Sequence, residues 1–392
     1  MHPLKVPRVR QVAIIGTGLT KFGRSEQGVV ELTGEASLHA LEDSHTLDAS
    51  FDAVFVGNMA SGEFEGRSGI ANALVSDLAL EPAFGAKVEN TSGSGAAAVY
   101  AGWMAIASGA SDLVLVCGGE KMTALPTDAV TDVIATLTHP EEYKQGITLP
   151  SYAGLMARVY LEKFEAPREA LARVAVKNHL HGSLNPNAQF QKVISLEQAL
   201  ASPMIADPLR LYDFCPITDG AAALVLAPLE RARSYVANPV VIRGIAGATD
   251  THVVHERPDL TLMEAVRRAA ERAYRTAGIE AHEIDVAELH DMATILEIVQ
   301  SEDLGFFEKG EGWKAVQAGV TGLKGAMPIN TSGGLKAKGH PIGATGVAQL
   351  VELTWQIQQR AGQRQVDADV GLACNVAGFG NNVVVTIVGR PE

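Results

Sequence analysis

Short apolar runs alternate with helical patterns along most of the chain. Runs rich in Val, Ile, Leu and Ala predict β-strands at 12–16, 53–56, 113–117, 240–244, 286–289, 370–373 and 383–388. Helical spacing is clearest after Thr345, where Val347, Leu350, Val351 and Trp355 fall on one face. Because strands that alternate with helices are typical of layered α/β proteins, the pattern predicts an α/β fold.

The chain contains an internal repeat. The tetrapeptide Asn-Thr-Ser-Gly at 90–93 recurs at 330–333, and the stretch 52–59 is echoed by 285–292. Both pairs are separated by nearly the same number of residues, so one duplication with a small change in length accounts for them. The sequence therefore predicts two similar halves.

The stretch 120–215 breaks this alternation. It is interrupted by Pro126, Pro140 and Pro150 and contains few strand-like runs, although 149–164 has a helical pattern. We interpret it as an inserted loop domain that acts as a lid. The predicted division is 1–119 with 216–236 for the N-terminal half, 120–215 for the insertion, and 237–392 for the C-terminal half.

Composition and charge restrict the class of protein. With 392 residues, of which 47% are hydrophobic, the chain is long enough to bury a substantial core. A net charge of −13 opposes attraction to nucleic acid or anionic membrane surfaces. Cys117, Cys215 and Cys374 show no paired or metal-binding spacing, which suits a reducing cytoplasm and predicts no metal site. At 1–10 no charged start leads into a long apolar run, so we expect neither a signal peptide nor a membrane span.

Candidate chemistry is concentrated at 330–345, Asn-Thr-Ser-Gly-Gly-Leu-Lys-Ala-Lys-Gly-His-Pro-Ile-Gly-Ala-Thr. Pro341 disfavours helical geometry at His340, and the neighbouring glycines let the backbone approach a ligand closely. Because a helix follows directly, His340 is expected near the partial positive charge of its N-terminus. A catalytic role for His340 follows.

Three further stretches of the chain, taken together with 330–345, resemble the motifs of a known protein family. They are Val-Glu-Asn-Thr-Ser-Gly-Ser-Gly at 88–95, Glu-Leu-His-Asp-Met-Ala-Thr-Ile-Leu-Glu at 288–297, and Cys-Asn-Val-Ala-Gly-Phe-Gly at 374–380. Together with 330–345 they resemble the thiolase superfamily, whose members make and break carbon–carbon bonds beside a coenzyme A thioester. The resemblance covers nearly the whole chain and is strongest to archaeal and sterol-carrier-protein-type thiolases. It implies a five-layer αβαβα fold of two duplicated halves, with two helices between two sheets and an inserted loop domain.

The resemblance also assigns a role to each site residue. Ser92 occupies the position of the thiolase nucleophile, and His340 would remove the nucleophile's proton. Cys374 would be the acid and base for carbon–carbon bond formation, while His290 would hold an oxyanion through water. Backbone N–H groups at Ser92 and Val376 would complete the oxyanion site. Substrate contacts are expected from Met292, Ser332, Gly339 and Gly378. In a chain of net negative charge, coenzyme A phosphates would need a local basic patch, for which the unranked candidates are Lys121, Arg158, Lys177, Lys336 and Lys338.

Two cysteines that the resemblance implies are absent. Ser92 replaces the nucleophile, and Met292 stands where the related branch often has a cysteine, so Cys374 would be the remaining thiol base. A serine hydroxyl is far less acidic than a thiol, whose reference pKa is about 8.5. Three interpretations of Ser92 stay open: an engineered replacement that traps substrate, a natural serine nucleophile, or a member that performs aldol-type cleavage or serves as a noncatalytic partner.

The expected activity is that of an acyl-CoA C-acyltransferase of lipid metabolism. It would catalyse thiolysis of 3-oxoacyl-CoA or Claisen condensation of acyl-CoAs such as acetyl-CoA, with coenzyme A thioesters as substrates and no cofactor. The alternative is a thiolase-like subunit of a heteromeric complex, noncatalytic alone or performing retro-aldol cleavage of a coenzyme A thioester. The implied partners are a second copy, in a homodimer or dimer of dimers, and a small OB-fold and zinc-ribbon protein.

Overall fold

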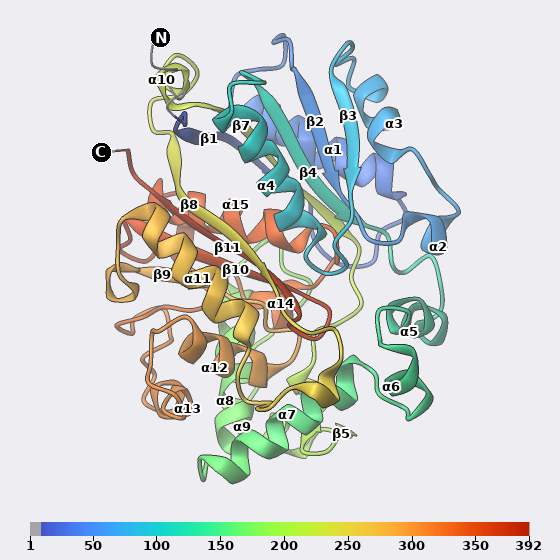
Figure 1. Cartoon of the computed structure of the whole chain (residues 1–392), viewed down its shortest axis with the longest axis vertical. Helices are drawn as coiled ribbons and strands as arrows, with labels where there is room; N and C mark the ends of the chain where they lie inside the picture. Colours follow the sequence, from blue (N-terminus) through green and yellow to red (C-terminus); the bar gives the residue numbers. More distant parts are fainter. Residues whose placement is uncertain (1–8, 392) are drawn as a thin grey trace, which may run out of the picture.

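A nine-stranded mixed sheet organises the chain in the computed structural model, which describes residues 9–391 (Figure 1). Its strands are β1 (Val12–Leu19), β2 (Ala53–Gly57), β3 (Phe84–Val88), β4 (Val114–Glu120), β7 (Gly220–Pro228), β8 (Val240–Thr249), β9 (Val286–Glu288), β10 (Val370–Ala377) and β11 (Asn382–Gly389). The spatial order is β3-β2-β4-β7-β1-β8-β11-β10-β9. The expected strands match β1, β2, β4, β8, β9, β10 and β11.

Fifteen α-helices occur within residues 9–391. They are α1 (Val29–Asp43), α2 (Ser61–Glu65), α3 (Ile70–Asp77), α4 (Ser94–Ala107), α5 (Thr127–Ala135), α6 (Pro140–Lys144), α7 (Leu149–Lys163), α8 (Glu169–Ser183), α9 (Leu196–Ala201), α10 (Leu229–Ala232), α11 (Glu264–Ala277), α12 (Thr294–Asp303), α13 (Gly312–Gln317), α14 (Gly334–Lys338) and α15 (Thr345–Ile357). The predicted helices at 149–164 and after Thr345 are α7 and α15.

The two halves share one strand order. In the N-terminal half the order is β1-β7-β4-β2-β3, and in the C-terminal half it is β8-β11-β10-β9. The place that corresponds to β3 is taken by Ile329, which forms a single parallel bridge with Ala287 of β9. Asn90 and Asn330 thus both follow the outermost segment of their half. The duplication predicted from the sequence is therefore present in the topology.

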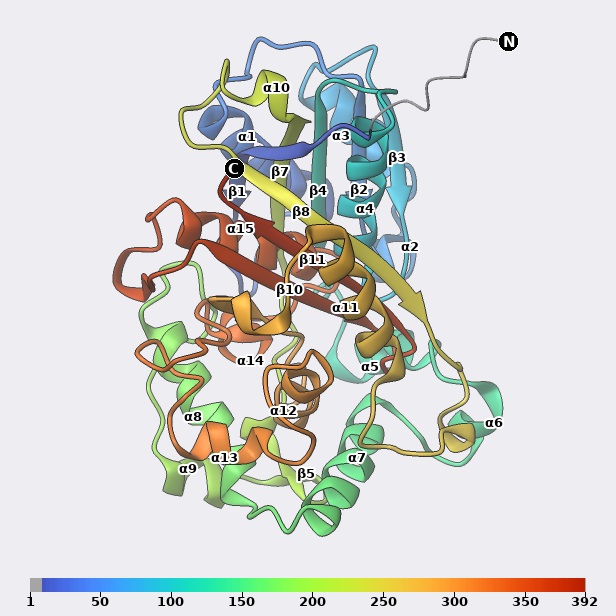
Figure 2. The same cartoon turned by 60° about the vertical axis from the view of Figure 1, so that its left-hand side comes forward.

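Five layers result from the packing of helices on these strands. Helices α1 and α3 cover one face of the N-terminal half, and α11 covers β8 and β11 of the other half (Figure 2). Between them lie α4 and α15, and α15 contacts both β10 and β7. The αβαβα order is as expected, but the two sheets are not separate, because Val12–Ile14 of β1 pair antiparallel with β8.

The segment between β4 and β7 contains α5 to α9 and a small hairpin formed by β5 (Met204–Ala206) and β6 (Leu209–Arg210). Helix α7 starts at a capping box in which Thr148 and Ser151 bond each other's backbone, with Pro150 in its first turn. Helix α8 packs on α12, α13 and α14, and α7 also contacts α12. The insertion therefore rests on the C-terminal half.

Glycines allow the loop before α15 to lie directly on the N-terminal half. A Cβ atom at Gly118 would lie 2.2 Å from the carbonyl oxygen of Gly343, and one at Gly95 would lie 2.6 Å from the same oxygen. A Cβ atom at Gly343 would lie 2.5 Å from the carbonyl oxygens of both Gly57 and Gly119. No side chain fits there, so backbone-to-backbone contact fixes the loop that carries His340.

Substitution of Gly118 by Ala tests this contact. Because the added methyl group overlaps a backbone oxygen, we expect Gly118→Ala to lower the free energy of unfolding by about 1–3 kcal/mol in urea titrations. Gly62→Ala is the matched control, since Gly62 lies in α2 with no atom near its missing Cβ. A Gly118→Ala protein as stable as Gly62→Ala would contradict the close contact.

Candidate active site

The turn between β3 and α4 presents Ser92, which is 4% exposed. Thr91 has a φ of 44°, a left-handed conformation that is strained for a β-branched residue. Two hydrogen bonds hold the turn: the Asn90 N–H donates to Ser94 Oγ at 2.9 Å, and that hydroxyl donates to the Thr91 carbonyl at 2.6 Å. Ser92 is thereby fixed beside the N-terminus of α4, where partial positive charge collects.

His340 lies in the loop before α15 with one ring nitrogen engaged. Its Nδ1 is 2.6 Å from the hydroxyl oxygen of Thr345, and that hydroxyl donates to the Pro341 carbonyl at 3.1 Å. Because this second bond uses the Thr345 proton, we assign the proton of His340 to Nδ1, which then donates to Thr345. Nε2 is then an unprotonated acceptor, and no group within residues 9–391 bonds to it. His340 has the form required of a general base.

His290 has the opposite arrangement of protons. Its Nδ1 faces two donors, the Asn375 amide at 3.0 Å and the Val376 N–H at 3.4 Å. A backbone N–H group can only donate a hydrogen bond, so we assign Nδ1 as the acceptor and the proton of His290 to Nε2. The His290 backbone is held by Gln300, whose amide bonds both its N–H and its carbonyl.

The two imidazole rings are in contact, with centroids 4.9 Å apart in an edge-to-face arrangement. Burial lowers the pKa of His340 to about 3, and the Lys338 charge lowers it further in the same direction. Burial, with the neighbouring His340, also holds the pKa of His290 well below its usual range. Both rings are therefore neutral at pH 7. With the protons assigned above, His340 offers the lone pair of its Nε2 and His290 offers its Nε2–H group.

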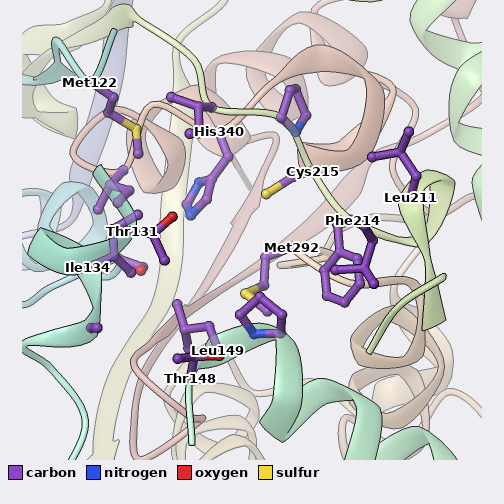
Figure 3. A pocket seen from close by; sticks show the side chains of 17 residues that line it. Met122, Thr131, Ile134, Thr148, Leu149, Leu211, Phe214, Cys215, Met292 and His340 are labelled. Carbon is purple, nitrogen blue, oxygen red and sulfur yellow. The ribbon is translucent and has the colours of Figure 1, made fainter. Parts of the chain in front are cut away.

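A cavity of about 240 Å³ opens onto His340 and Ser92 (Figure 3). Most of its wall is apolar, and the side chains come from the insertion, the N-terminal half, the His-Asp-Met loop and the His340 loop. The lining includes Met122, Ile134, Leu149, Pro150, Ile205, Leu211, Phe214, Cys215, Ile217, Met292 and Ile342. Of the four residues expected to contact substrate, Met292 lines this cavity.

Cys374 does not reach the cavity. It is fully buried in a core cluster that also contains residues of α11 and α12, and burial with the nearby Asp303 carboxylate raises the pKa of its thiol far above the usual range. Adjacent residues of a strand point to opposite faces, and the next residue, Asn375, is the one that contacts His290. Asn375, and not Cys374, is therefore the residue of β10 that contacts His290.

Other expected contacts are taken by internal partners. Ser332 is fully buried and its hydroxyl donates to Glu288 at 2.5 Å. The Val376 N–H is directed at His290 instead of an open oxyanion position. Gly339 and Gly378 do not line the cavity but form turns with φ of 115° and 56°. These four residues shape the site without facing its cavity.

Glu120 is a buried residue of the site that the sequence did not single out. Its carboxylate accepts from the N–H groups of Met59 at 2.9 Å, Ala60 at 3.0 Å and Gly343 at 3.1 Å, and from Asn58 Nδ2 at 2.8 Å. Burial raises the pKa of Glu120 to about 7, while the Met59 and Ala60 N–H groups oppose this shift. The carboxylate joins the ends of β2 and β4 to the His340 loop.

Most of the basic residues expected at coenzyme A phosphates are used inside the protein. Lys121 pairs with Asp219 at 2.7 Å, Lys177 with Glu297 at 3.0 Å, and Lys338 with Glu288 at 3.7 Å. Lys336 is buried, and burial lowers its pKa to about 8. Arg158 alone of this set is exposed, in an ion pair with Asp207. Ion pairing and burial remove the other four from a surface patch.

Within residues 9–391, no group of three or more His, Cys, Asp or Glu side chains is arranged to hold a metal ion. No helix in this part of the chain is long and apolar enough to span a bilayer. The prediction about 1–10 falls mainly on residues 1–8, which lie outside the described residues.

Family comparisons agree with this architecture. A model described as "Thiolase, N-terminal domain" matches residues 12–230, and one described as "Thiolase C-terminal domain-like" matches residues 246–390. The fold and the site together define a class of protein. Its members have a duplicated five-layer α/β fold with a histidine in the loop before the helix that corresponds to α15. The chain belongs to the thiolase family.

Individual relatives and solved structures are similar to nearly the whole of this chain. An acetyl-CoA acetyltransferase of Methanothermobacter thermautotrophicus is 43% identical over 387 residues, which cover 97% of this chain and all of that protein. Human sterol carrier protein 2 is 31% identical over the whole chain and 74% of its own length. Among solved structures, the Ltp2-ChsH2(DUF35) aldolase has a TM-score of 0.85 at 25% identity, covering 98% of both chains. Human mitochondrial 3-ketoacyl-CoA thiolase in complex with CoA has a TM-score of 0.77 at 16% identity, covering 98% of this chain and 99% of that one.

Substitution of Thr345 by Val tests the proton arrangement of His340. Loss of the hydroxyl leaves the buried Nδ1–H without an acceptor, so we expect unfolding free energy to fall by about 1–3 kcal/mol and nitrogen NMR to show a changed tautomer. Thr354→Val is the matched control on α15, because the Thr354 hydroxyl is buried without a partner. Equal effects of the two substitutions would contradict this arrangement.

Proposed function

We propose that the protein is an acyl-CoA C-acyltransferase that cleaves 3-oxoacyl-CoA by thiolysis and catalyses the reverse Claisen condensation. One observation carries this proposal: two neutral imidazoles in contact hold their protons in opposite ways, and one of them, His340, lines the same cavity as Ser92. His340 offers an open lone pair, and His290 offers an N–H. The first suits removal of a proton from a nucleophile, and the second suits stabilisation of a developing oxyanion or enolate. The acetyltransferase relative supports coenzyme A thioesters as substrates.

The proposed reaction begins at Ser92. His340 Nε2 takes the hydroxyl proton as the oxygen attacks the keto carbon of the substrate, and His290 Nε2–H donates to negative charge that forms on a substrate oxygen. Cleavage of the carbon–carbon bond leaves an acyl group on Ser92. Coenzyme A then removes that acyl group as a thioester. Compared with a thiol, serine depends more on the general base, because its hydroxyl ionises less readily.

The cavity supports an acyl group longer than acetyl. Its wall is formed mainly by Met, Ile, Leu, Phe and Pro side chains, and its volume of about 240 Å³ exceeds the needs of a two-carbon unit. An apolar wall stabilises each buried methylene group by about 0.8 kcal/mol. We therefore place the preferred substrates among medium-length or branched 3-oxoacyl-CoAs. We also propose that the enzyme acts in lipid metabolism in the cytoplasm and needs no cofactor.

A second candidate function is retro-aldol cleavage of a 3-hydroxyacyl-CoA. The observation in its favour is the similarity to a structure described as an aldolase, together with the serine at position 92. Aldol cleavage needs a base for the substrate hydroxyl and a donor to the enolate but no acyl-enzyme. His340 and His290 would fill those two roles. The description of that structure pairs Ltp2 with ChsH2(DUF35), which supports a partner protein for this chain. We propose a small OB-fold and zinc-ribbon protein in that place.

The sheet edge supports association of two chains. Strand β3 ends the sheet, Phe84 on it is 64% exposed, and Met104 on the adjacent α4 is 50% exposed (Figure 1). An unpaired edge with exposed apolar side chains favours pairing with another strand. We propose a homodimer through β3, alone or within a dimer of dimers.

Substitution at Ser92 separates the two candidate reactions. For thiolysis of 3-oxooctanoyl-CoA, we expect Ser92→Ala to lower kcat by at least about 100-fold and Ser92→Cys to raise it, because a thiol ionises more readily. Loss of substrate enolate absorbance measures the rate. Cleavage of 3-hydroxyoctanoyl-CoA that is unaffected by Ser92→Ala, without thiolysis by either wild type or Ser92→Cys, would establish the aldol reaction instead.

Light scattering tests the dimer. We expect twice the mass of one chain for the wild type and a single-chain mass for Phe84→Lys, because a lysine on an edge strand opposes strand pairing. Leu180→Lys, at an exposed position of α8, is the control and should remain dimeric. A wild type that elutes at the mass of one chain at all concentrations would exclude the dimer.

A further inference from the structure

We infer that Cys215 transfers the proton at the α-carbon of the coenzyme A thioester during carbon–carbon bond cleavage and formation. This inference rests on the proposed function, which requires an acid and base for that carbon. Neither the cysteine expected beside the His-Asp pair nor Cys374 supplies it. Position 292 is a methionine, and Cys374 is fully buried on the other side of β10.

Cys215 is the cysteine that shares a cavity with Ser92 and His340. Its sulfur points into the cavity toward the His340 ring and the Met292 side chain (Figure 3). Cys117 and Cys374, the other two cysteines of the chain, are both fully buried in strands of the sheet. The thiol of Cys215 is thus the one placed for contact with a substrate.

An independent observation indicates that a ligand occupies this space. His340 is only 6% exposed, but its ring lines the cavity, and no group within residues 9–391 bonds to its Nε2. An accepting nitrogen that is open to a cavity and bonds to no protein group is satisfied by water or by a ligand. The cavity that holds this open nitrogen also holds the Cys215 thiol, so both groups face the same ligand.

Backbone contacts fix Cys215 beside the His-Asp-Met loop. The Cys215 N–H donates to the Met292 carbonyl at 2.9 Å, and Phe214 forms an antiparallel bridge with Ala293. These bonds join the end of the insertion to the loop that carries His290. A thiol at 215 therefore lies close to the place where a thiol at 292 would lie.

The other protic groups of the cavity are already assigned. The Thr131 hydroxyl donates to the Thr127 carbonyl at 2.8 Å, and Thr148 forms the capping box of α7. Ser92 and His340 act on the acyl carbon in the proposed reaction. Because aliphatic hydroxyls are poor acids and bases at neutral pH, the remaining group suited to proton transfer is the thiol.

The proposed cleavage conserves protons and electron pairs. When the bond between the α-carbon and the keto carbon breaks, its electron pair goes to the thioester enolate, and the Cys215 S–H proton moves to the α-carbon to give the shortened acyl-CoA. The cysteine is left as a thiolate and His340 as an imidazolium. Incoming coenzyme A gives its thiol proton to Cys215 as its sulfur attacks the acyl group, and His340 returns its proton to the Ser92 oxygen.

The surroundings of Cys215 favour the protonated thiol needed at the start of cleavage. Burial raises the pKa of Cys215 to about 12, and the Lys336 ammonium opposes this shift. The same ammonium stabilises the thiolate that forms after the proton has moved. The resting protein therefore holds an acid at this position.

Two reactions of the whole protein separate this role from a structural one. Thiolysis of 3-oxooctanoyl-CoA needs proton transfer at carbon, whereas exchange of labelled coenzyme A into octanoyl-CoA needs only Ser92 and His340. We expect Cys215→Ala and Cys215→Ser to lower kcat for thiolysis by at least about 100-fold while exchange stays within about threefold of wild type. Cys117→Ala, a buried cysteine outside the cavity, is the matched control and should retain both reactions.

Other results for the Cys215 variants or the wild type would contradict the proton transfer by Cys215. Thiolysis within about threefold of wild type in Cys215→Ala overturns the role of Cys215 and leaves the proposed acyltransferase function standing. Equal loss of exchange and thiolysis in both Cys215 variants shows that the residue maintains the site's structure, which also overturns the inference. A wild type without exchange or thiolysis refutes the proposed function, and the inference falls with it.

Discussion

Direct contact between backbones, with no side chain between them, holds the His340 loop on the N-terminal half. Gly118 and Gly95 leave room for the Gly343 carbonyl, and Gly343 leaves room for the ends of two strands. Interiors are packed densely enough that even one added methyl group is felt. Because Ser92 and His340 come from opposite halves, the distance between their side chains depends on how closely these glycines let the halves approach.

Buried polar groups then determine which form of each imidazole is present. Thr345 holds the proton of His340 on Nδ1, and Asn375 with Val376 keeps Nδ1 of His290 unprotonated. Removal from water makes the charged forms unfavourable, so two histidines in contact can both remain neutral. Glu120 binds four donors from separate segments and therefore orients the loop without touching the cavity.

The sequence predicted most of the fold but a smaller part of the site. Strands with continuous apolar runs and α15 with its 3.6-residue period were predicted correctly, whereas β7 was missed because its alanine-rich run also suits a helix. Cys374 was assigned to the site and Asn375 was not, because sequence alone does not say which face of β10 points inward. Cys215 lies far from the catalytic motifs along the chain, and only the fold brings it beside Met292.

The C-terminal half has no strand that corresponds to the edge strand β3, and this difference limits how chains can assemble. A duplicated sheet with two open edges could add copies without end, as fibres do. In the C-terminal half a single bridge at Ile329 takes the place of that strand, and side chains of α8 bind carbonyls that no strand pairs. Lys177 Nζ donates to the Ile329 carbonyl at 2.7 Å, and His181 Nδ1 lies 2.9 Å from the Asn330 carbonyl. The insertion therefore closes one end of the sheet, so association of chains by strand pairing stops once the single remaining edge is paired.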